Sequence, residues 1–269
     1  MSDKTNIRQT VEKGDNSVQI AEQNNYFNNV NVGMNATDAC ELAIKLFYEN
    51  FPKLEEKALE TVNKRVDEFK KSLLQEFANR KIIDFSALSE PDVQFALVEA
   101  QKTYARFGEE NMLEYLAKLV VDRIENDNGD ISLKVAIDQA IKVIGLLNSA
   151  QLDYLSLIFI VKSVRIEGIT NCSEFQSFID RIAEIFKNAA HKSFGYLNML
   201  GCFMLDLGSA IERLHKAYPF LQGAKINYPQ VLSKVPGDYG TSQLGAVLAI
   251  VNAQIKLNYR FDMKIWIHS

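Results

Sequence analysis

The histidines and cysteines are the residues of this chain best suited to bind a metal ion or to act as nucleophiles. They lie far apart, at positions His191, His215, His268, Cys40, Cys172 and Cys202. The sequence has no H-E-x-x-H or C-x-x-C pair and no acidic calcium loop, the spacings that place several ligands around one ion. We therefore expect no metal centre and no cofactor.

The motifs of common catalytic folds are missing as well. There is no phosphate loop, no G-x-G-x-x-G fingerprint and no G-x-S-x-G elbow. The helical ribonucleases of prokaryotic defence use an Arg followed a few residues later by a His. Arg213 and His215 are too close together for that pattern, and Arg181 and His191 are too far apart. We interpret Arg213 and His215 as cations at a helix C-terminus.

Scattered carboxylates remain the last candidates for acid–base chemistry, since sites on helices can escape motif searches. Glu99, Glu114 and Asp122 lie on predicted helices. Nothing in their spacing pairs them, and we expect all three in solvated positions. The sequence thus predicts no catalytic residue, and we do not expect an enzyme.

Composition places the chain among globular proteins. It has 269 residues, of which 47% are hydrophobic and 24% are charged, with a formal net charge of −4. Such a balance offers no basic field for nucleic acid. The N-terminus lacks an apolar signal region, and no apolar run approaches the roughly 20 residues of a membrane span. With an odd number of dispersed cysteines, these features predict a soluble, cytoplasmic protein.

The elements that carry these residues fall into three parts, the first of which, residues 1–35, is rich in Asn and Gln. Segments 17–20 and 26–32 alternate with period two, the pattern of short strands. Their apolar face predicts an oligomer interface: Val18, Ile20, Tyr26, Val30 and Val32. Because an isolated two-stranded ribbon is marginal in water, these strands need a partner, either the helical body or the same segment of another subunit. The alternative is a polar tail without fixed structure.

The second part, residues 37–218, follows the helical period almost throughout. We expect helices over these ranges: 37–51, 52–80, 91–107, 113–124, 133–147, 152–164 and 175–189, with one or two more between 193 and 218. The segment 152–164 is apolar on nearly every side and should lie at the centre. Together the helices predict a bundle-like, mainly α body.

The third part, residues 219–269, predicts a small β-α-β subdomain packed on the body. Segments 224–228 and 263–267 are typical of short strands, and residues 242–257 follow a helical pattern. A helix beside a hairpin is also found in winged-helix DNA readers. However, Lys256 is the single cation of this helix, and phosphate binding needs several, so nucleic acid is not an expected partner.

One resemblance extends over nearly the whole chain. Its motifs are the Gly14-Asp15-Asn16 and Asn31-Val32-Gly33 turns, the Phe51-Pro52-Lys53-Leu54 run, Pro91-Asp92-Val93-Gln94 and the ending Ile265-Trp266-Ile267. In these the chain resembles a large uncharacterised family of bacterial proteins with a Gly- and Asn-rich β segment ahead of a helical body. The resemblance implies a bacterial cytosolic protein. Similar N-terminal segments occur in proteins suspected of antiviral (phage) defence, and no catalytic residue is carried over.

Three functions from different classes follow. The first is a non-catalytic, homo-oligomeric interaction or scaffold protein, such as a sensor or adaptor in antiphage defence, whose protein partner is unknown. The second is a helical effector or toxin that assembly activates. The third is an enzyme of unrecognised type. We favour the first because the chain offers strands that need partners and no catalytic motif.

Overall fold

The computed structural model describes residues 36–80, 85–126 and 129–267. The chain divides into two units, Met1–Lys57 and Ala58–Ser269, and each is described by itself. The expected interface residues lie outside the described residues: Val18, Ile20, Tyr26, Val30 and Val32. Their part in assembly stays a prediction, as does the division of the chain into 1–35, 37–218 and 219–269.

The first described helix, α2 (Ala36–Asn79), runs through Pro52 without a break. The prediction that a new helix begins at Pro52 is therefore wrong. A proline inside a helix removes one backbone hydrogen bond and costs roughly 3 kcal/mol. The helix-favouring residues on both sides outweigh that cost. In the second unit, Phe69 and Leu73 of α2 are buried in the core.

Three helices pack against one another: α3 (Pro91–Phe107), α4 (Glu110–Glu125) and α5 (Ile131–Val143). Pro91 occupies the first turn of α3, where a missing N–H is tolerated. Gly108 ends that helix at φ 64°, in the left-handed region that glycine adopts without strain. Asp130 caps α5 by accepting a hydrogen bond from the Ser132 N–H. The helices predicted over these segments are confirmed.

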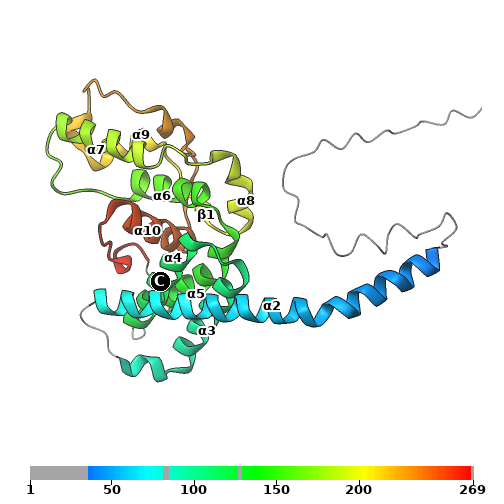
Figure 1. Ribbon diagram of the computed structural model, residues 1–269. Coiled ribbons are helices and arrows are strands. Elements are labelled where there is room, and N and C mark those ends of the chain that lie inside the picture. The colour runs from blue at the N-terminus through cyan, green and yellow to red at the C-terminus, as the bar shows by residue number, and fades with distance from the viewer. Residues whose placement is uncertain (1–35, 81–84, 127–128, 268–269) are drawn as a thin grey trace, which may run out of the picture. The chain divides into compact units, whose positions relative to one another are not determined.

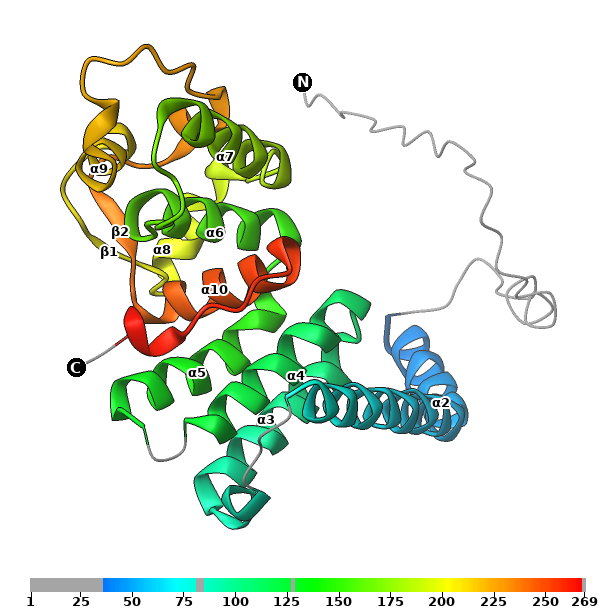
Figure 2. The ribbon, with the colours of Figure 1, turned by 90° about the vertical axis from the view of Figure 1, so that its left-hand side faces the viewer.

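Two further helices form the centre of the fold and lie side by side in both views: α6 (Ser149–Ser163) and α10 (Gln243–Leu257) (Figures 1 and 2). The prediction of a central helix over 152–164 is confirmed, because α6 is buried on nearly every side. Helix α10 also contacts α5, so it lies between α6 and the group of α3, α4 and α5 (Figure 2).

Three shorter helices lie around α6: α7 (Cys172–Ile185), α8 (Phe194–Met199) and α9 (Ala210–Ala217) (Figures 1 and 2). Short 3-10 turns occur elsewhere along the described chain, at Phe85–Ser89, Ile144–Leu146, His191–Ser193, Pro219–Leu221, Gln230–Lys234 and Met263–Ile265. The Asn171 side chain caps α7, and Ser209 with Glu212 forms a capping box at α9.

The described residues contain one small sheet, in which β1 (Phe203–Leu205) pairs with β2 (Tyr239–Thr241) in antiparallel register. The prediction of strands over 224–228 and 263–267 is wrong. In the first segment, the Gln176 side chain bonds both the N–H and the C=O of Asn227 and so replaces a neighbouring strand. In the second, Asp262 accepts a hydrogen bond from the Lys264 N–H and starts a 3-10 turn.

The mainly α fold is confirmed, since helices dominate the described residues and the strands are short. The helix predicted over 242–257 is also confirmed, and its side chains share one hydrophobic core with those of α4, α5 and α6. Among the described residues, no helix combines the length and the apolar character that crossing a membrane requires.

Candidate functional site

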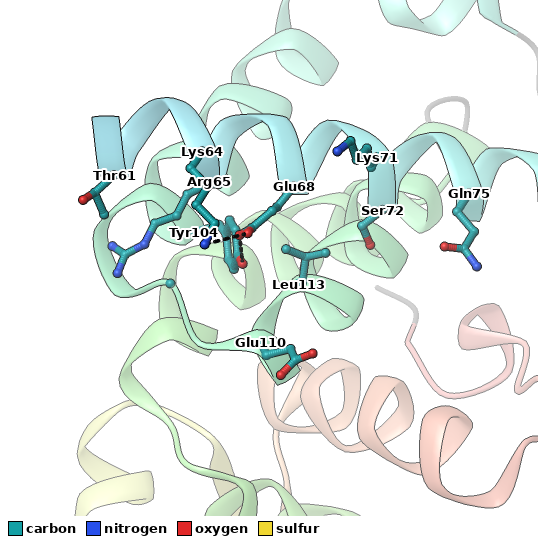
Figure 3. A pocket seen from close by; sticks show the side chains of 11 residues that line it. Thr61, Lys64, Arg65, Glu68, Lys71, Ser72, Gln75, Tyr104, Glu110 and Leu113 are labelled. Carbon is teal, nitrogen blue, oxygen red and sulfur yellow. Dashed lines mark hydrogen bonds and ion pairs between the residues drawn. The ribbon is translucent and has the colours of Figure 1, made fainter. Parts of the chain in front are cut away.

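A groove of about 690 Å³ lies between the second half of α2 and helices α3 and α4 (Figure 3). Its lining comes mostly from polar side chains of α2. Figure 3 shows Lys64 and Tyr104 both directed at Glu68, with the Tyr104 hydroxyl donating to the carboxylate at 2.9 Å. The groove therefore offers charged and hydrogen-bonding groups rather than an apolar surface.

Arg65 holds one end of this groove. Its Nη1 donates to the Ala105 carbonyl at 2.7 Å and to the Arg106 carbonyl at 3.2 Å, at the negative end of α3. A Cβ at position 108 would meet the Arg65 guanidinium at 2.1 Å, so Gly108 makes room for it. Arg65 thus joins α2 to the C-terminus of α3, and its role is to position these helices.

Tyr104 is the other chemically notable residue in the groove. Burial, reinforced by the hydrogen bond to Glu68, raises the pKa of Tyr104 to about 12. At neutral pH the phenol therefore keeps its proton and acts as a donor. Neither Arg65 nor Tyr104 is poised as a nucleophile or a base, and the arrangement suits binding of polar groups better than catalysis.

A second cavity, of about 470 Å³, lies where α4 meets the C-terminal segment 260–264. Behind it, the buried Arg80 bonds three carboxylates, those of Glu76 at 2.9 Å, Asp122 at 3.0 Å and Glu125 at 2.9 Å. Arg260 adds a second cation to Glu125, at 2.7 Å. This network ties the end of α2 to α4 and to the C-terminal segment.

The expectation that Asp122 lies in a solvated position is wrong. The residue is only 5% exposed, and burial raises the pKa of its carboxyl to about 6 despite the opposing charge of Arg80. Within the described residues, its Oδ2 has no hydrogen-bond partner, nor has the nearby Asn126 Oδ1. Glu114 is more than half exposed, and Glu99 pairs with Lys102 near the surface. The three candidates do not form one site.

A third polar group, which no sequence motif indicates, lies inside the helical core. Asn252 of α10 accepts from the Tyr115 hydroxyl at 2.6 Å and donates to Asp153 at 3.1 Å and to Ser156 at 2.8 Å. Lys256 neutralises Asp153 at 2.7 Å. The signal was present, because Asp153 and Asn252 interrupt apolar runs. Their hydrogen bonds join α4, α6 and α10, so these polar groups are engaged inside the core.

The histidines and cysteines remain dispersed. His215 Nε2 lies 2.9 Å from the Tyr228 hydroxyl, and His191 begins a separate 3-10 turn. Burial raises the pKa of the Cys202 thiol to about 12, so this thiol is a core group. His268 and the side chain of Cys40 lie outside the described residues. Across the ranges that the structure describes, no three His, Cys, Asp or Glu residues gather as metal ligands would.

A stretch of exposed apolar side chains follows β1 and its flanks. We call it the β1 strip: Met199, Met204, Leu205, Leu207 and Ile211, which are between 43% and 73% exposed. The sequence pattern predicts helices in this region and does not indicate the strip. Gly201 and Gly208, both at positive φ, mark the turns that bring the chain out of α8 and into α9. By strand alternation Met204 lies on the face opposite Leu205 and Leu207, so the strip exposes apolar side chains on both faces of β1. Exposed apolar side chains grouped along one segment make it a candidate interaction surface.

Comparison with known proteins places the chain in a family. No curated protein and no solved structure matches it. A protein-family model matches residues 33–244, which is most of the chain. The description of this family names no activity. The chain therefore belongs to the uncharacterised family that this model describes.

Proposed function

We propose that this protein is a non-catalytic interaction protein that assembles with copies of itself and serves as a sensor or adaptor in bacterial defence against phage. The observation that carries the proposal is the β1 strip, whose five apolar side chains lie within thirteen consecutive positions, 199–211. Burying such side chains against a partner releases about 25 cal/mol for each Å² removed from water.

The polar cavities support the same conclusion. Three of their groups that could take part in chemistry are engaged by internal partners: Arg65 by the carbonyls of α3, Tyr104 by Glu68, and Arg80 by three carboxylates. The defence setting rests on the resemblance of the N-terminal segment to segments of proteins suspected of that role.

The test is the native mass of the full chain, measured by light scattering over a range of concentrations. We expect a mass well above the 30.4 kDa of one chain. Met204→Asp with Leu207→Asp should lower that mass, because carboxylates would have to be buried at the contact. Leu74→Asp, at an exposed apolar position of α2, is the matched control and should leave the mass unchanged. A single-chain mass for the unaltered protein at every concentration would refute the proposal.

A further inference from the structure

The two edges of the small sheet differ, and the hydrogen-bond pattern shows how. The Asp206 N–H donates to the Asp238 carbonyl, and the Ser242 N–H donates to the Cys202 carbonyl. The backbone groups of these two pairs therefore point toward the neighbouring strand. In an antiparallel pair, inward and outward residues alternate. Met204 therefore bonds across to Gly240, whereas the backbone groups of Phe203 and Leu205 point away from β2.

The edge of β2 is contacted by α6. By the same alternation the Tyr239 carbonyl points away from β1, and there Lys162 of α6 donates to it at 2.9 Å. The same ammonium group donates to the carbonyls of Gly237 and Asp206, each at 3.1 Å. The Lys162 side chain is 1% exposed, so a buried cation occupies the outward edge of β2 at Tyr239.

The edge of β1 is open. Among the described residues, the backbone N–H and C=O groups of Phe203 and Leu205 have no hydrogen-bond partner. Two side chains of the β1 strip beside this edge, Leu205 and Leu207, are about two-thirds exposed. Unpaired backbone groups next to exposed apolar side chains are the features that favour addition of a strand from elsewhere.

We propose that the edge of β1 receives residues 26–32 from a second copy of this chain. The inference rests on the proposed self-assembly and names its contact. In the sequence, Tyr26, Val30 and Val32 share one face of the predicted strand. Paired at the edge of β1, this face covers Leu205 and Leu207, and the backbone of 26–32 supplies the partners that Phe203 and Leu205 lack.

A second copy fits the extent of the β1 strip better than the same chain does. One strand covers the edge, but the strip continues to Met199 at the end of α8 and to Ile211 on α9. A second copy brings a strand and a strip of its own. Reciprocal exchange about a two-fold axis therefore covers more apolar surface than pairing within one chain.

A pair of substitutions at one position tests the edge contact. Leu205→Pro removes the outward N–H and leaves the Met204–Gly240 bonds in place, whereas Leu205→Ala shortens the side chain and keeps the N–H. We expect Leu205→Pro to fall to 30.4 kDa at concentrations where Leu205→Ala and the unaltered protein stay assembled. Circular dichroism should show the helical body folded in all three. A Leu205→Pro protein that is folded and assembled like the others would overturn the inference.

Cross-linking decides the case in which Leu205→Pro fails to fold, and it identifies the donor of the strand. One preparation, carrying a tag, has Val30→Cys, and the other has Leu205→Cys, both in a background with the native cysteines replaced. After mixing and oxidation we expect a disulfide between tagged and untagged chains, and none when Leu74→Cys replaces Leu205→Cys. In a chain that carries both substitutions, a link formed only within that chain would overturn the role of the second copy. No link in either format would overturn pairing at β1.

These outcomes separate the inference from the proposed function. If the unaltered protein has the mass of one chain, self-assembly itself fails. If it assembles, but Leu205→Pro has no effect and no link forms, only the contact at β1 fails.

Discussion

At the scale of residues, the buried charged side chains of α4 are the most informative feature of the molecule. Asp122 and Arg123 are neighbours in sequence and both are buried, yet they pair with charged residues of different elements. Asp122 pairs with Arg80 at the end of α2, and Arg123 pairs with Asp92 of α3 and Asp138 of α5. Because an unpaired buried charge is costly, these contacts fix how α2, α3 and α5 surround α4.

The raised pKa of Asp122 makes stability depend on pH in a defined direction. The carboxyl titrates near its usual value of 3.8 when unfolded and at about 6 when folded. Between these values the folded state binds more protons, so the stability from this group is complete below about pH 4 and is lost as the pH rises through 6. The free energy of unfolding of the unaltered protein should fall by roughly 3 kcal/mol over this range, at about 1.36 kcal/mol per pKa unit. We expect Asp122→Asn to abolish that fall.

Urea unfolding at pH 4 and at pH 7 measures this difference. Glu114→Gln, an exposed carboxylate on the same helix, is the control and should keep the pH dependence of the unaltered protein. An Asp122→Asn protein that loses as much stability between these pH values as the unaltered protein would show that Asp122 does not titrate in this range.

At the scale of elements, the sheet depends on one side chain of the central helix. Lys162 reaches from the last turn of α6 to three carbonyls of the segments that carry β1 and β2. Burial lowers the pKa of Lys162, and Asp206 opposes that shift. The lysine occupies the edge of β2 at Tyr239 and makes no contact with the outward backbone groups of β1.

Lys162→Met should therefore destabilise the fold by about 3 kcal/mol or more, since it leaves three carbonyls without this donor and each unsatisfied buried acceptor costs roughly 1–3 kcal/mol. Lys187→Met removes a surface ion pair with Glu184 and should cost less than about 1 kcal/mol. Urea unfolding compares the two, and amide hydrogen exchange at Gly240 should accelerate in Lys162→Met alone. Equal losses of stability in both variants would contradict the role given to Lys162.

The same elements show what the sequence could predict. Helical periodicity and local caps such as Pro91, Gly108 and Asn171 predicted most helices, because those signals lie within a few residues of one another. The strands were predicted at the wrong positions because the hydrogen-bond partners lie far away in the sequence. The Gln176 side chain of α7 bonds the backbone of Asn227, and β1 pairs with β2, which follows α9 in the chain. The burial of Asp122 was missed for the same reason, since Arg80 lies 42 positions away.

At the scale of the whole molecule, the open edge of β1 and the predicted strands of the N-terminal segment need each other. The described body provides unpaired backbone groups beside exposed apolar side chains, and the sequence of residues 14–33 predicts strands with an apolar face to bury. Neither feature alone indicates assembly, since exposed apolar residues are common on surfaces and polar termini are often without fixed structure. Together they predict that the N-terminal segment is required for assembly and dispensable for folding.

Deleting residues 1–33 tests that division of roles. The helical body should keep its circular dichroism spectrum and its unfolding midpoint, because its core is built from residues beyond the deleted segment. Its native mass should fall to that of one chain. Val30→Asp with Val32→Asp should lower the mass in the same way, since each valine contributes about 1–2 kcal/mol when buried and each carboxylate resists burial. Asn29→Asp with Asn31→Asp, on the opposite face of the predicted strand, is the matched control and should weaken assembly less. If the truncated chain and the valine variant both keep the mass of the unaltered protein, assembly does not depend on this segment, and the interpretation of residues 1–35 as a polar tail is the better one.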